Sequence, residues 1–480
     1  MDLQPHRFPA SATPVADLLD TIRRKRTKDI DWRRGRAFCL IYHPGDEREH
    51  AIKQVFDQYY ADNALNPTAT PSLAELESEA VSMCADLFHA DADACGNITT
   101  GGTESILLAV KTARDWAGKN KPHIKRAHAV VPESVHPAFM KAFQIMEVDY
   151  TAVKVGGDYR ADVAAMERAI RPETILLVGS APSYPFGVID PIADIAALAQ
   201  QRGLLCHVDA CIGGFMLPFL SDIGYDVPAF DFRVAGVTSL SADIHKYGYS
   251  PKGASVILYR SHDLRRHQFS LYTKWAGGIY ASPTITGTRA GGNIAGAWAA
   301  LRTIGREGYV EMAKATMAAT EQLKQAAADI PELKLMGRPD MSIVTVQSDQ
   351  IDVYMLADEL NKKGWHFERQ QLPPSLHFTV NYIHRDIMPE FIADLKSCIA
   401  TVRDQRLAQL GNKLQTSVVK GLSKILPDGA IARLQKNSTP DINNENKAAM
   451  YGMMGALSGT DDLEQIVLDF LDTIYTAKPE

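Results

Sequence analysis

The feature that most constrains the fold is a series of short apolar runs that alternate with helical patterns. The runs lie at residues 127–131, 174–179, 204–209, 236–241 and 254–259. Helical patterns such as ADVAAMERAI and IADIAALAQQ separate the earlier runs. Apolar strands joined by helices of about 10 to 15 residues are typical of a parallel sheet covered on both faces. The middle of the chain is therefore predicted to be an α/β domain.

On this pattern the chain of 480 residues divides into three parts. Residues 1–62 form an N-terminal segment, with a helix expected over residues 47–62. Residues 63–304 form the large α/β domain, in which Ser72 and Glu75 have the spacing of a capping box at a helix start. Residues 305–480 are predicted to form a small α+β domain and a tail.

Charge and cysteine content limit the classes of partner. The 51 Lys and Arg residues against 57 Asp and Glu leave a net charge of −6, so no nucleic-acid partner is expected. The six cysteines include no C-x-x-C pair, which argues against a disulfide framework or a zinc site. No metal is predicted, and sparse cysteines favour a reducing compartment.

The sequence shows no targeting or membrane-spanning pattern. The N-terminus lacks the charged start and apolar core of a signal peptide, and no apolar run reaches about 18 residues. We therefore expect a cytoplasmic protein. Residues 412–426 place apolar side chains at helical spacing among lysines. We expect this helix to pack on the domain, with at most peripheral membrane contact.

Polar groups follow several predicted elements at the places where a parallel sheet binds ligands. Thr100-Gly101-Gly102-Thr103 opens a helix, and free N–H groups at a helix start suit a phosphate. Asp209 ends an apolar strand, where a carboxylate needs a cationic or hydrogen-bonding partner. Lys246 follows another strand, where desolvation is expected to lower its pKa and favour attack on a carbonyl. Each feature alone also fits an ordinary turn, cap or solvated loop residue.

Together these features match the requirements of one cofactor. The phosphate of pyridoxal 5′-phosphate needs backbone donors, its ring nitrogen needs a carboxylate and its aldehyde needs a lysine. The chain offers the three in this order, and His136 offers a flat ring that can stack on the cofactor. The sequence therefore predicts pyridoxal 5′-phosphate as the cofactor.

Longer segments carry a resemblance to a known family. They include HVDACIGGFMLPF, TSLSADIHKYGYSPKGASVILYR and GGIYASPTITGTRAGG. These segments resemble the sphingosine-1-phosphate lyases, fold-type I pyridoxal-phosphate enzymes related to the group II decarboxylases. The resemblance covers the chain from about residue 30 to residue 475. It implies a transferase-like α/β fold, with a mostly parallel sheet in the large domain and a small α+β C-terminal domain.

The resemblance also implies roles for matching residues. Lys246 would attach the cofactor aldehyde, Asp209 would pair with the ring nitrogen, and His136 would stack on the ring. The cofactor phosphate would be held by Gly102, Thr103, His245 and, from a neighbouring subunit, Gly287 and Thr288. The substrate would be surrounded by Tyr42, Asn63, Asn66, Tyr184, Cys211, Lys252, Tyr280 and Tyr451. A homodimer with shared active sites follows from these assignments.

One position departs from the family pattern. The segment Asn63-Ala64-Leu65-Asn66-Pro67 has an asparagine where the family has a histidine that helps to bind the substrate phosphate. An asparagine donates hydrogen bonds but carries no charge. We therefore expect weaker phosphate binding or a broader substrate range.

The implied reaction is the retro-aldol cleavage of sphingosine 1-phosphate or sphinganine 1-phosphate. Its products would be a long-chain aldehyde and phosphoethanolamine. Both Tyr184 and Lys252 are candidates for the base that removes the β-hydroxyl proton. Two alternatives remain open, a group II amino-acid decarboxylase and a non-catalytic pyridoxal-phosphate protein that acts as a scaffold.

Overall fold

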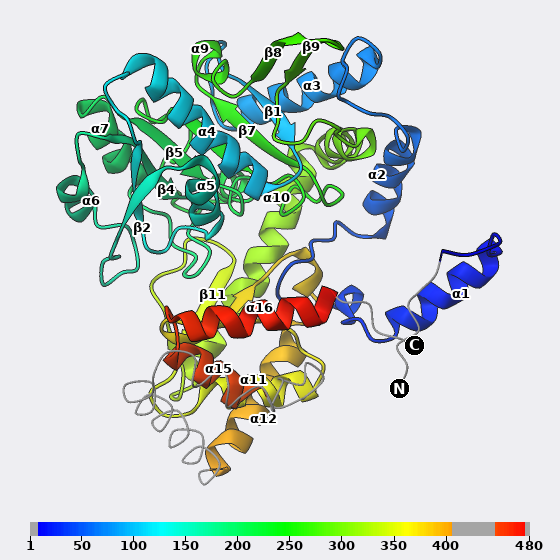
Figure 1. Cartoon of the computed structure of the whole chain (residues 1–480). Helices are drawn as coiled ribbons and strands as arrows, with labels where there is room; N and C mark the ends of the chain where they lie inside the picture. The colour runs from blue at the N-terminus through cyan, green and yellow to red at the C-terminus, as the bar shows by residue number, and fades with distance from the viewer. Residues whose placement is uncertain (1–7, 406–446, 476–480) are drawn as a thin grey trace.

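The structure is a computed structural model that describes residues 8–405 and 447–475. Its main element is a seven-stranded sheet in the order β1-β7-β6-β5-β4-β2-β3 (Figure 1). The strands are β1 (Cys95–Thr99), β2 (His128–Pro132), β3 (Asp149–Val153), β4 (Thr174–Ser180), β5 (Leu205–Asp209), β6 (Ser239–Ala242) and β7 (Ser255–Tyr259). The five apolar runs of the sequence all contribute strands to this sheet. The helix expected over residues 412–426 lies outside the described residues.

The sheet is mostly parallel. Strands β2 to β6 pair in parallel, whereas β7 runs antiparallel to both β6 and β1. Strand β7 reverses because the connection from β6 contains no crossover helix, and a parallel strand needs such a crossover. The sequence pattern missed β1 and β3, which lie at the two edges of the sheet. Edge strands need no continuous apolar run, and β3 alternates between half-buried and exposed residues until its buried last residue.

Helices cover both faces of the sheet. One face packs on α4 (Gly102–Asn120) and α5 (Ala138–Met146), and the other packs on α3 (Pro71–Leu87), α7 (Ile192–Gln201) and α8 (Leu217–Asp222). Two short helices, α6 (Val163–Ala169) and α9 (His262–Arg265), complete this region. Side chains alternate between the two faces along each strand, as Val130 and Val131 do in β2.

The capping box expected at Ser72 and Glu75 is wrong. Helix α3 begins at Pro71 with Thr70 as its N-cap residue, and no side chain caps it. Ser72 therefore already lies in the first helical turn. Proline fits this position because its missing N–H would have no helical acceptor and its fixed φ suits a helix.

The N-terminal segment contains α1 (Val15–Arg26), the 3-10 helix η1 (Trp32–Arg34) and α2 (Asp46–Gln58). Helix α2 ends four residues before the expected limit of 62. Helix α10 (Gly291–Asp329) then passes from the large domain into the C-terminal region, with a kink at Gly305, where φ is +61°. The kink falls beside the predicted boundary at residue 304, and the domain limits themselves stay a prediction.

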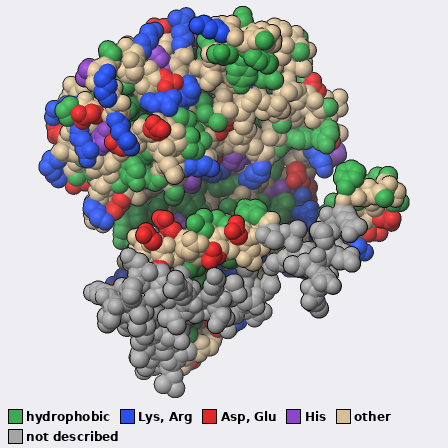
Figure 2. Space-filling model, in the orientation of Figure 1, with side chains coloured by type: hydrophobic (Ala, Val, Ile, Leu, Met, Phe, Trp, Pro, Cys, Tyr) green, Lys and Arg blue, Asp and Glu red, His purple; other side chains and the backbone are tan. Residues whose placement is uncertain are grey.

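The C-terminal region contains a four-stranded antiparallel sheet in the order β10-β11-β13-β12. Its elements are β10 (Lys334–Leu335), β11 (Ile343–Gln347), α11 (Val353–Lys362), β12 (Glu368–Gln371), β13 (Pro374–Thr379), η2 (Tyr382–His384), α12 (Met388–Asp404), α15 (Ala448–Ala456) and α16 (Asp461–Tyr475). Phe38 of the N-terminal segment packs into this core and stacks on His384 at 4.2 Å between ring centroids. Figure 2 shows hydrophobic side chains in the recess between α16 and the large domain.

A separate hairpin of β8 (Ser270–Trp275) and β9 (Gly278–Ser282) lies outside both sheets. Its residues are exposed except for Ser282, and the exposed ones include Leu271, Trp275 and Ile279. Among the described residues, none of the helices combines the length and apolar character needed to cross a bilayer.

Candidate active site

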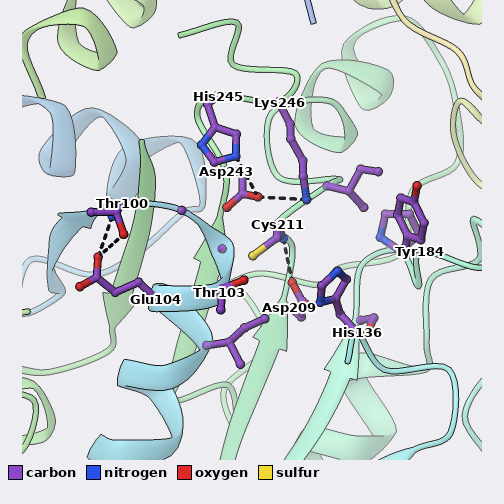
Figure 3. Close-up of a pocket in the computed structure, with 16 residues that line it drawn as sticks. Thr100, Thr103, Glu104, His136, Tyr184, Asp209, Cys211, Asp243, His245 and Lys246 are labelled. Atoms are coloured by element: carbon purple, nitrogen blue, oxygen red, sulfur yellow. Dashed lines mark hydrogen bonds and ion pairs between the residues drawn. The ribbon is translucent and has the colours of Figure 1, made fainter. Parts of the chain in front are cut away.

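A cavity of about 320 Å³ lies at the carboxyl ends of the strands, where the sheet meets the start of α4 (Figure 3). Strand β4 contributes Ser180 and strand β5 contributes Asp209. The cavity brings together eight of the predicted site residues. They are Gly102, Thr103, His136, Tyr184, Asp209, Cys211, His245 and Lys246.

The first turn of α4 forms one wall of the cavity. Gly101 precedes the helix with φ of +151°, a value that favours glycine. A Cβ atom at Gly102 would lie 2.9 Å from both carboxylate oxygens of Asp243 and from the Sγ atom of Cys211. Only glycine therefore lets the backbone approach so closely. A helix start of this kind offers free N–H groups that suit an anion.

Asp209 lines the cavity from the end of β5 and is 7% exposed. Its Oδ1 atom accepts a hydrogen bond of 3.0 Å from the backbone N–H of Cys211. The Cys211 thiol donates to Ser241 Oγ at 3.3 Å, and the Nε2 atom of His207 lies 3.1 Å from the same oxygen. Burial lowers the pKa of His207 to about 4, so this ring is neutral near pH 7. The carboxylate therefore faces the cavity over a rigid, hydrogen-bonded floor.

Lys246 extends from the opposite side and pairs with Asp243, with 3.0 Å between Nζ and Oδ2. Burial by itself would lower the pKa of the Lys246 ammonium group. The neighbouring Asp243 carboxylate raises it, and the net pKa lies above the usual range for lysine. The expectation of a lowered pKa is wrong for this arrangement, because the sequence argument counted desolvation and not the carboxylate.

Two aromatic side chains complete the cavity. The ring of His136 lies 6.4 Å from that of Tyr184, nearly perpendicular to it, and His136 Nδ1 accepts a hydrogen bond from the N–H of Ala138. Burial lowers the pKa of His136, although the Asp209 carboxylate opposes this effect. Burial, and then the charge of Glu368, raise the pKa of the Tyr184 phenol above its usual range. Near pH 7 the imidazole is therefore neutral and the phenol is protonated.

Lys252 lies beside the cavity without lining it. Its Nζ atom donates to the carbonyl oxygen of His245 at 2.8 Å and lies 4.8 Å from the centre of the Tyr42 ring. Although Lys252 as a residue is exposed, these contacts desolvate its ammonium group. Burial, and then the charge of Lys246, lower the pKa of Lys252 to about 8, and Asp243 offsets this only in part. A substantial fraction of this amine is therefore neutral at mildly alkaline pH.

The other predicted site residues lie outside the cavity of this chain. Asn66 forms a local turn in which its Oδ1 atom accepts from the N–H and hydroxyl groups of Thr68, at 3.0 and 2.7 Å. Tyr451 packs its ring 5.7 Å from that of Tyr354 in the C-terminal region. Tyr42 also lies outside the cavity, with its ring beside Lys252. The remaining four belong to one surface near the β8–β9 hairpin and are Asn63, Tyr280, Gly287 and Thr288.

Two buried acids of the cavity were not singled out in the sequence. Asp243 pairs with Lys246, and its position three residues before the lysine, directly after the apolar end of β6, was an available signal. Glu104 lines the cavity from the first turn of α4, at the end of the TGGTE segment. Its partners include residues 285 and 286, which lie far along the chain. No local pattern reveals such a contact.

The cavity fits pyridoxal 5′-phosphate. Two buried polar atoms at its walls, Asp243 Oδ1 and Ser180 Oγ, have no hydrogen-bond partner among the residues that the structure describes. The helix start offers N–H donors to a phosphate, Asp209 offers a carboxylate to a cationic ring, and Lys246 offers an amine to an aldehyde. These groups lie on different walls of one space, as a planar cofactor with three reactive edges requires.

Known proteins match both the sequence and this geometry. Residues 1–347 match the family model described as the pyridoxal-dependent decarboxylase conserved domain. The sphingosine-1-phosphate lyase of Oryza sativa is 41% identical over 394 residues, which are 80% of this chain and 73% of the relative. The sphingosine-1-phosphate lyase 1 of Rattus norvegicus is 36% identical over 98% of this chain and 77% of the relative.

A solved structure of a sphingosine-1-phosphate lyase from Burkholderia pseudomallei has a TM-score of 0.81 and 37% identity to this chain. The match covers 88% of this chain and 98% of that structure. Fold and cavity thus define a fold-type I enzyme that uses pyridoxal phosphate. Within this class, the chain belongs to the sphingosine-1-phosphate lyase family.

Proposed function

We propose that this protein cleaves the bond between the α- and β-carbons of a phosphorylated sphingoid base, releasing a long-chain aldehyde and phosphoethanolamine. The observation that carries the proposal is the convergence of Lys246, Asp209 and the start of α4 in one cavity. The relatives that match over most of the chain are named as lyases of this type. This reading is favoured over an amino-acid decarboxylase and over a non-catalytic scaffold.

In our proposal the walls of the cavity hold the cofactor by its separate groups. Gly102, Thr103 and His245 bind the phosphate, and Asp209 pairs with the ring nitrogen. His136 covers one face of the ring, and Lys246 supplies the amine. When bound, pyridoxal phosphate supplies an electron sink for the electron pair left on the substrate α-carbon as the bond breaks. Asp243 is the nearest acceptor for the proton that the Lys246 ammonium must lose before its amine can react.

We assign the role of base to Lys252 and not to Tyr184. The base must accept the proton of the β-hydroxyl group, and it works best with a pKa near the operating pH. The pKa of Lys252 is lowered to about 8, whereas that of Tyr184 is raised. The protonated phenol is instead suited to donate a hydrogen bond to the substrate. Cys211 lies at the floor of the cavity and contributes to its shape.

The remaining predicted residues support a homodimer with shared active sites. Gly287 is half-buried and Thr288 is exposed, and neither lines the cavity of its own chain. The neighbouring hairpin exposes apolar side chains, including Leu271, which is 68% exposed, and Ile279, which is 76% exposed. An exposed apolar patch of this kind is typical of a protein interface. In the dimer, Gly287 and Thr288 would reach the cofactor phosphate of the partner.

Around the substrate, Tyr42, Asn63, Asn66, Tyr280 and Tyr451 would contact the phosphate and the chain of the lipid. We further propose that the enzyme acts in the cytoplasm. All six cysteines are buried and unpaired, as a reducing compartment favours. Any membrane contact would then serve only to collect the lipid substrate.

The decisive experiment incubates the purified holoenzyme with sphinganine 1-phosphate. Fatty aldehyde and phosphoethanolamine in equal amounts are expected, and carbon dioxide release from a panel of amino acids is not. Production of carbon dioxide without aldehyde would replace the lyase assignment with the decarboxylase. A protein that binds the cofactor and yields neither product would be a scaffold.

A further inference from the structure

Glu104 is a buried carboxylate in the first turn of α4, 5% exposed, at the wall of the cavity. Among the described residues it forms no ion pair with a lysine or an arginine. Its charge is instead balanced by hydrogen-bond donors from two segments of the chain and by the positive end of the helix dipole. A buried charge placed in this way holds those two segments together.

The first segment is the loop that leads into α4. Glu104 Oε2 accepts a hydrogen bond of 2.7 Å from the N–H of Thr100 and one of 2.8 Å from the Thr100 hydroxyl group (Figure 3). Residues 100–103 are the part of the chain that faces the cofactor phosphate in our proposal. Glu104 therefore sets the conformation of its own phosphate-binding loop.

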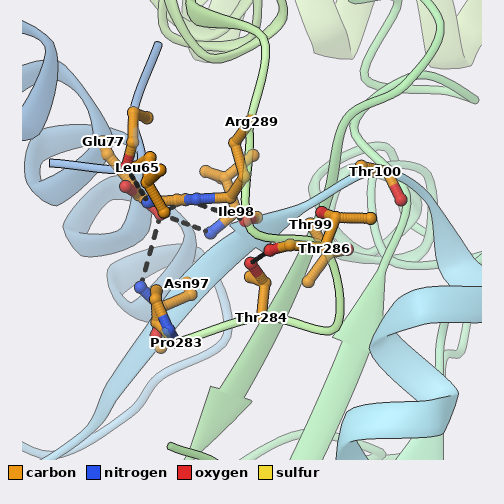
Figure 4. Close-up of polar contacts among 12 residues, drawn as sticks. Leu65, Glu77, Asn97, Ile98, Thr99, Thr100, Pro283, Thr284, Thr286 and Arg289 are labelled. Carbon is orange, nitrogen blue, oxygen red and sulfur yellow. Dashed lines mark hydrogen bonds and ion pairs between the residues drawn. The ribbon is translucent and has the colours of Figure 1, made fainter. Parts of the chain in front are cut away.

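The second segment is the loop of residues 283–289, which crosses beside β1 (Figure 4). Glu104 Oε1 accepts from the N–H groups of Ile285 and Thr286, at 3.0 and 3.2 Å. The two oxygens of one carboxylate thus bind two segments that are about 180 residues apart in the sequence. The conformation of residues 285–286 therefore depends on a buried carboxylate from another element.

Further contacts hold the other end of the same loop. The buried Arg289 donates to Glu77 Oε1 at 2.5 Å and to the carbonyl oxygen of Ile98 at 3.3 Å (Figure 4). Asn63 donates to the hydroxyl group of Thr288 at 3.3 Å. Gly287 and Thr288 therefore lie between two anchors, at the surface but held in place. A loop fixed at both ends is suited to present these residues to another subunit.

We propose that Glu104 is a positioning residue that couples the two cofactor-phosphate sites of the homodimer. One oxygen orders the phosphate loop of its own cavity, and the other orders the loop that reaches the cavity of the partner. The inference rests on the shared active sites of the proposed function. It adds that filling one site stabilises the conformation of Glu104 that completes the other site, so that the two sites bind the cofactor cooperatively.

The test uses mixed dimers purified through two different affinity tags. One subunit keeps Lys246 and the other carries Lys246→Ala, so each dimer has a single site for covalent cofactor attachment. That site combines its own phosphate loop with residues 285–288 of the subunit that carries Lys246→Ala. Cofactor-free dimers are titrated with pyridoxal 5′-phosphate, reduced with borohydride and digested, and the labelled Lys246 peptide is counted.

Glu104→Gln in the subunit that carries Lys246→Ala is expected to raise the dissociation constant of the intact site about tenfold. The glutamine amide has one acceptor oxygen, and its NH2 group would oppose one set of donors. An unchanged dissociation constant would overturn the coupling, because it would mean that Glu104 affects only the cavity of its own subunit. If Glu104→Gln does not fold, Glu104→Asp replaces it. The aspartate keeps the charge but is too short to reach both segments, so the dissociation constant of the intact site is again expected to rise.

The matched control is Glu79→Gln in the same subunit. This exposed carboxylate on α3 accepts a hydrogen bond from the indole N–H of Trp298 at 2.7 Å, away from the cavity. The control should leave the dissociation constant unchanged, and an equal rise would mean general loosening and overturn the proposal. Because no lipid is present, the result is independent of the substrate. A chain that proves monomeric would instead refute the shared site of the proposed function.

Discussion

The cavity and the loop of residues 283–289 are separated by little more than β1 and the start of α4, yet they are built in opposite ways. The acids of the cavity are almost fully enclosed, with Asp243 3% exposed and Asp209 7% exposed. The hairpin turns outward, with Ile279 76% exposed, and the loop exposes residues 285, 286 and 288 between the buried Thr284 and Arg289. Both regions carry residues that the family resemblance assigns to one active site.

This difference in burial shows that the two regions contribute different groups to the site. The enclosed region supplies the groups whose chemistry needs low solvation, namely an amine, a carboxylate and a phosphate-binding helix start. In our proposal the outward region supplies groups that act only when a second chain covers them. A single chain therefore brings together the reactive groups of the cavity, and in our proposal a second chain completes its binding part.

The largest effect is expected from removing the amine of the enclosed region. Lys246→Ala should abolish the absorbance of the attached cofactor and lower turnover on the order of 10⁴-fold. The reason is that, in the described part of the chain, Lys246 is the one lysine that lines the cavity, whereas Lys252 lies outside it. Absorbance spectra and aldehyde production are the measurements. Borohydride labelling of a residue other than Lys246 in the wild-type protein would contradict the assignment.

The next largest effect is expected from Lys252, which lies beside the enclosed region, next to Tyr42 and the carbonyl oxygen of His245. If its neutral amine takes the hydroxyl proton, kcat/KM should rise with pH up to about 8, because deprotonation of the ammonium group creates the base. Lys252→Met should lower turnover by about 10³-fold and remove this rise.

Lys252→Arg is the matched variant for this prediction. It keeps the charge but stays protonated, so it should be as inactive as Lys252→Met. An active arginine variant would mean that Lys252 serves as a cation for the substrate phosphate. In that case the activity of the wild type should fall, and not rise, as pH passes through about 8.

A smaller effect is expected in the outward region. Gly287→Asp would place a carboxylate beside the partner's cofactor phosphate and lower the activity of the homodimer by about 10²-fold. Its own chain should tolerate the change, because the nearest atom to an added Cβ, the Tyr280 hydroxyl oxygen, would lie 3.5 Å away.

Mixing this variant with Lys246→Ala sharpens the comparison between the regions. Mixed dimers contain one site in which both defects are absent. Roughly a quarter of the wild-type activity should return, since half of randomly formed dimers are mixed and each has one intact site. If activity does not return although the subunits exchange, Gly287 acts in the site of its own chain.

The smallest effect is expected at Asn66. Asn66→His should lower KM for the phosphorylated substrate by about threefold below pH 6, where the imidazole carries a charge, and less at pH 8. The exposed turn at this position already uses the asparagine Oδ1 atom in a bond to Thr68. Asn66→Gln should not make KM depend on pH in this way, because the glutamine side chain carries no charge. A pH-independent gain with the histidine would point to a change in the turn and not to charge.

Much of the enclosed region could be predicted from the sequence. The phosphate loop opens the predicted helix α4, and Asp209 and Lys246 each follow a strand whose end is visible in the hydrophobic pattern. The direction of β7 and the edge strands β1 and β3 could not be predicted in the same way. Their pairing depends on the connection and on neighbours in the sheet, and not on their own periodicity.

The sequence by itself determined the α/β class, the cofactor and the chain order of the groups that would bind it. Local hydrogen bonding and side-chain burial decide these features, and both leave periodic patterns in the chain. Only the tertiary structure decided that Lys246 pairs with Asp243 and that its pKa is raised and not lowered. It alone showed that Glu104 joins residues 100 and 285–286. Charge interactions act through space, so their sign depends on neighbours that sequence distance does not reveal.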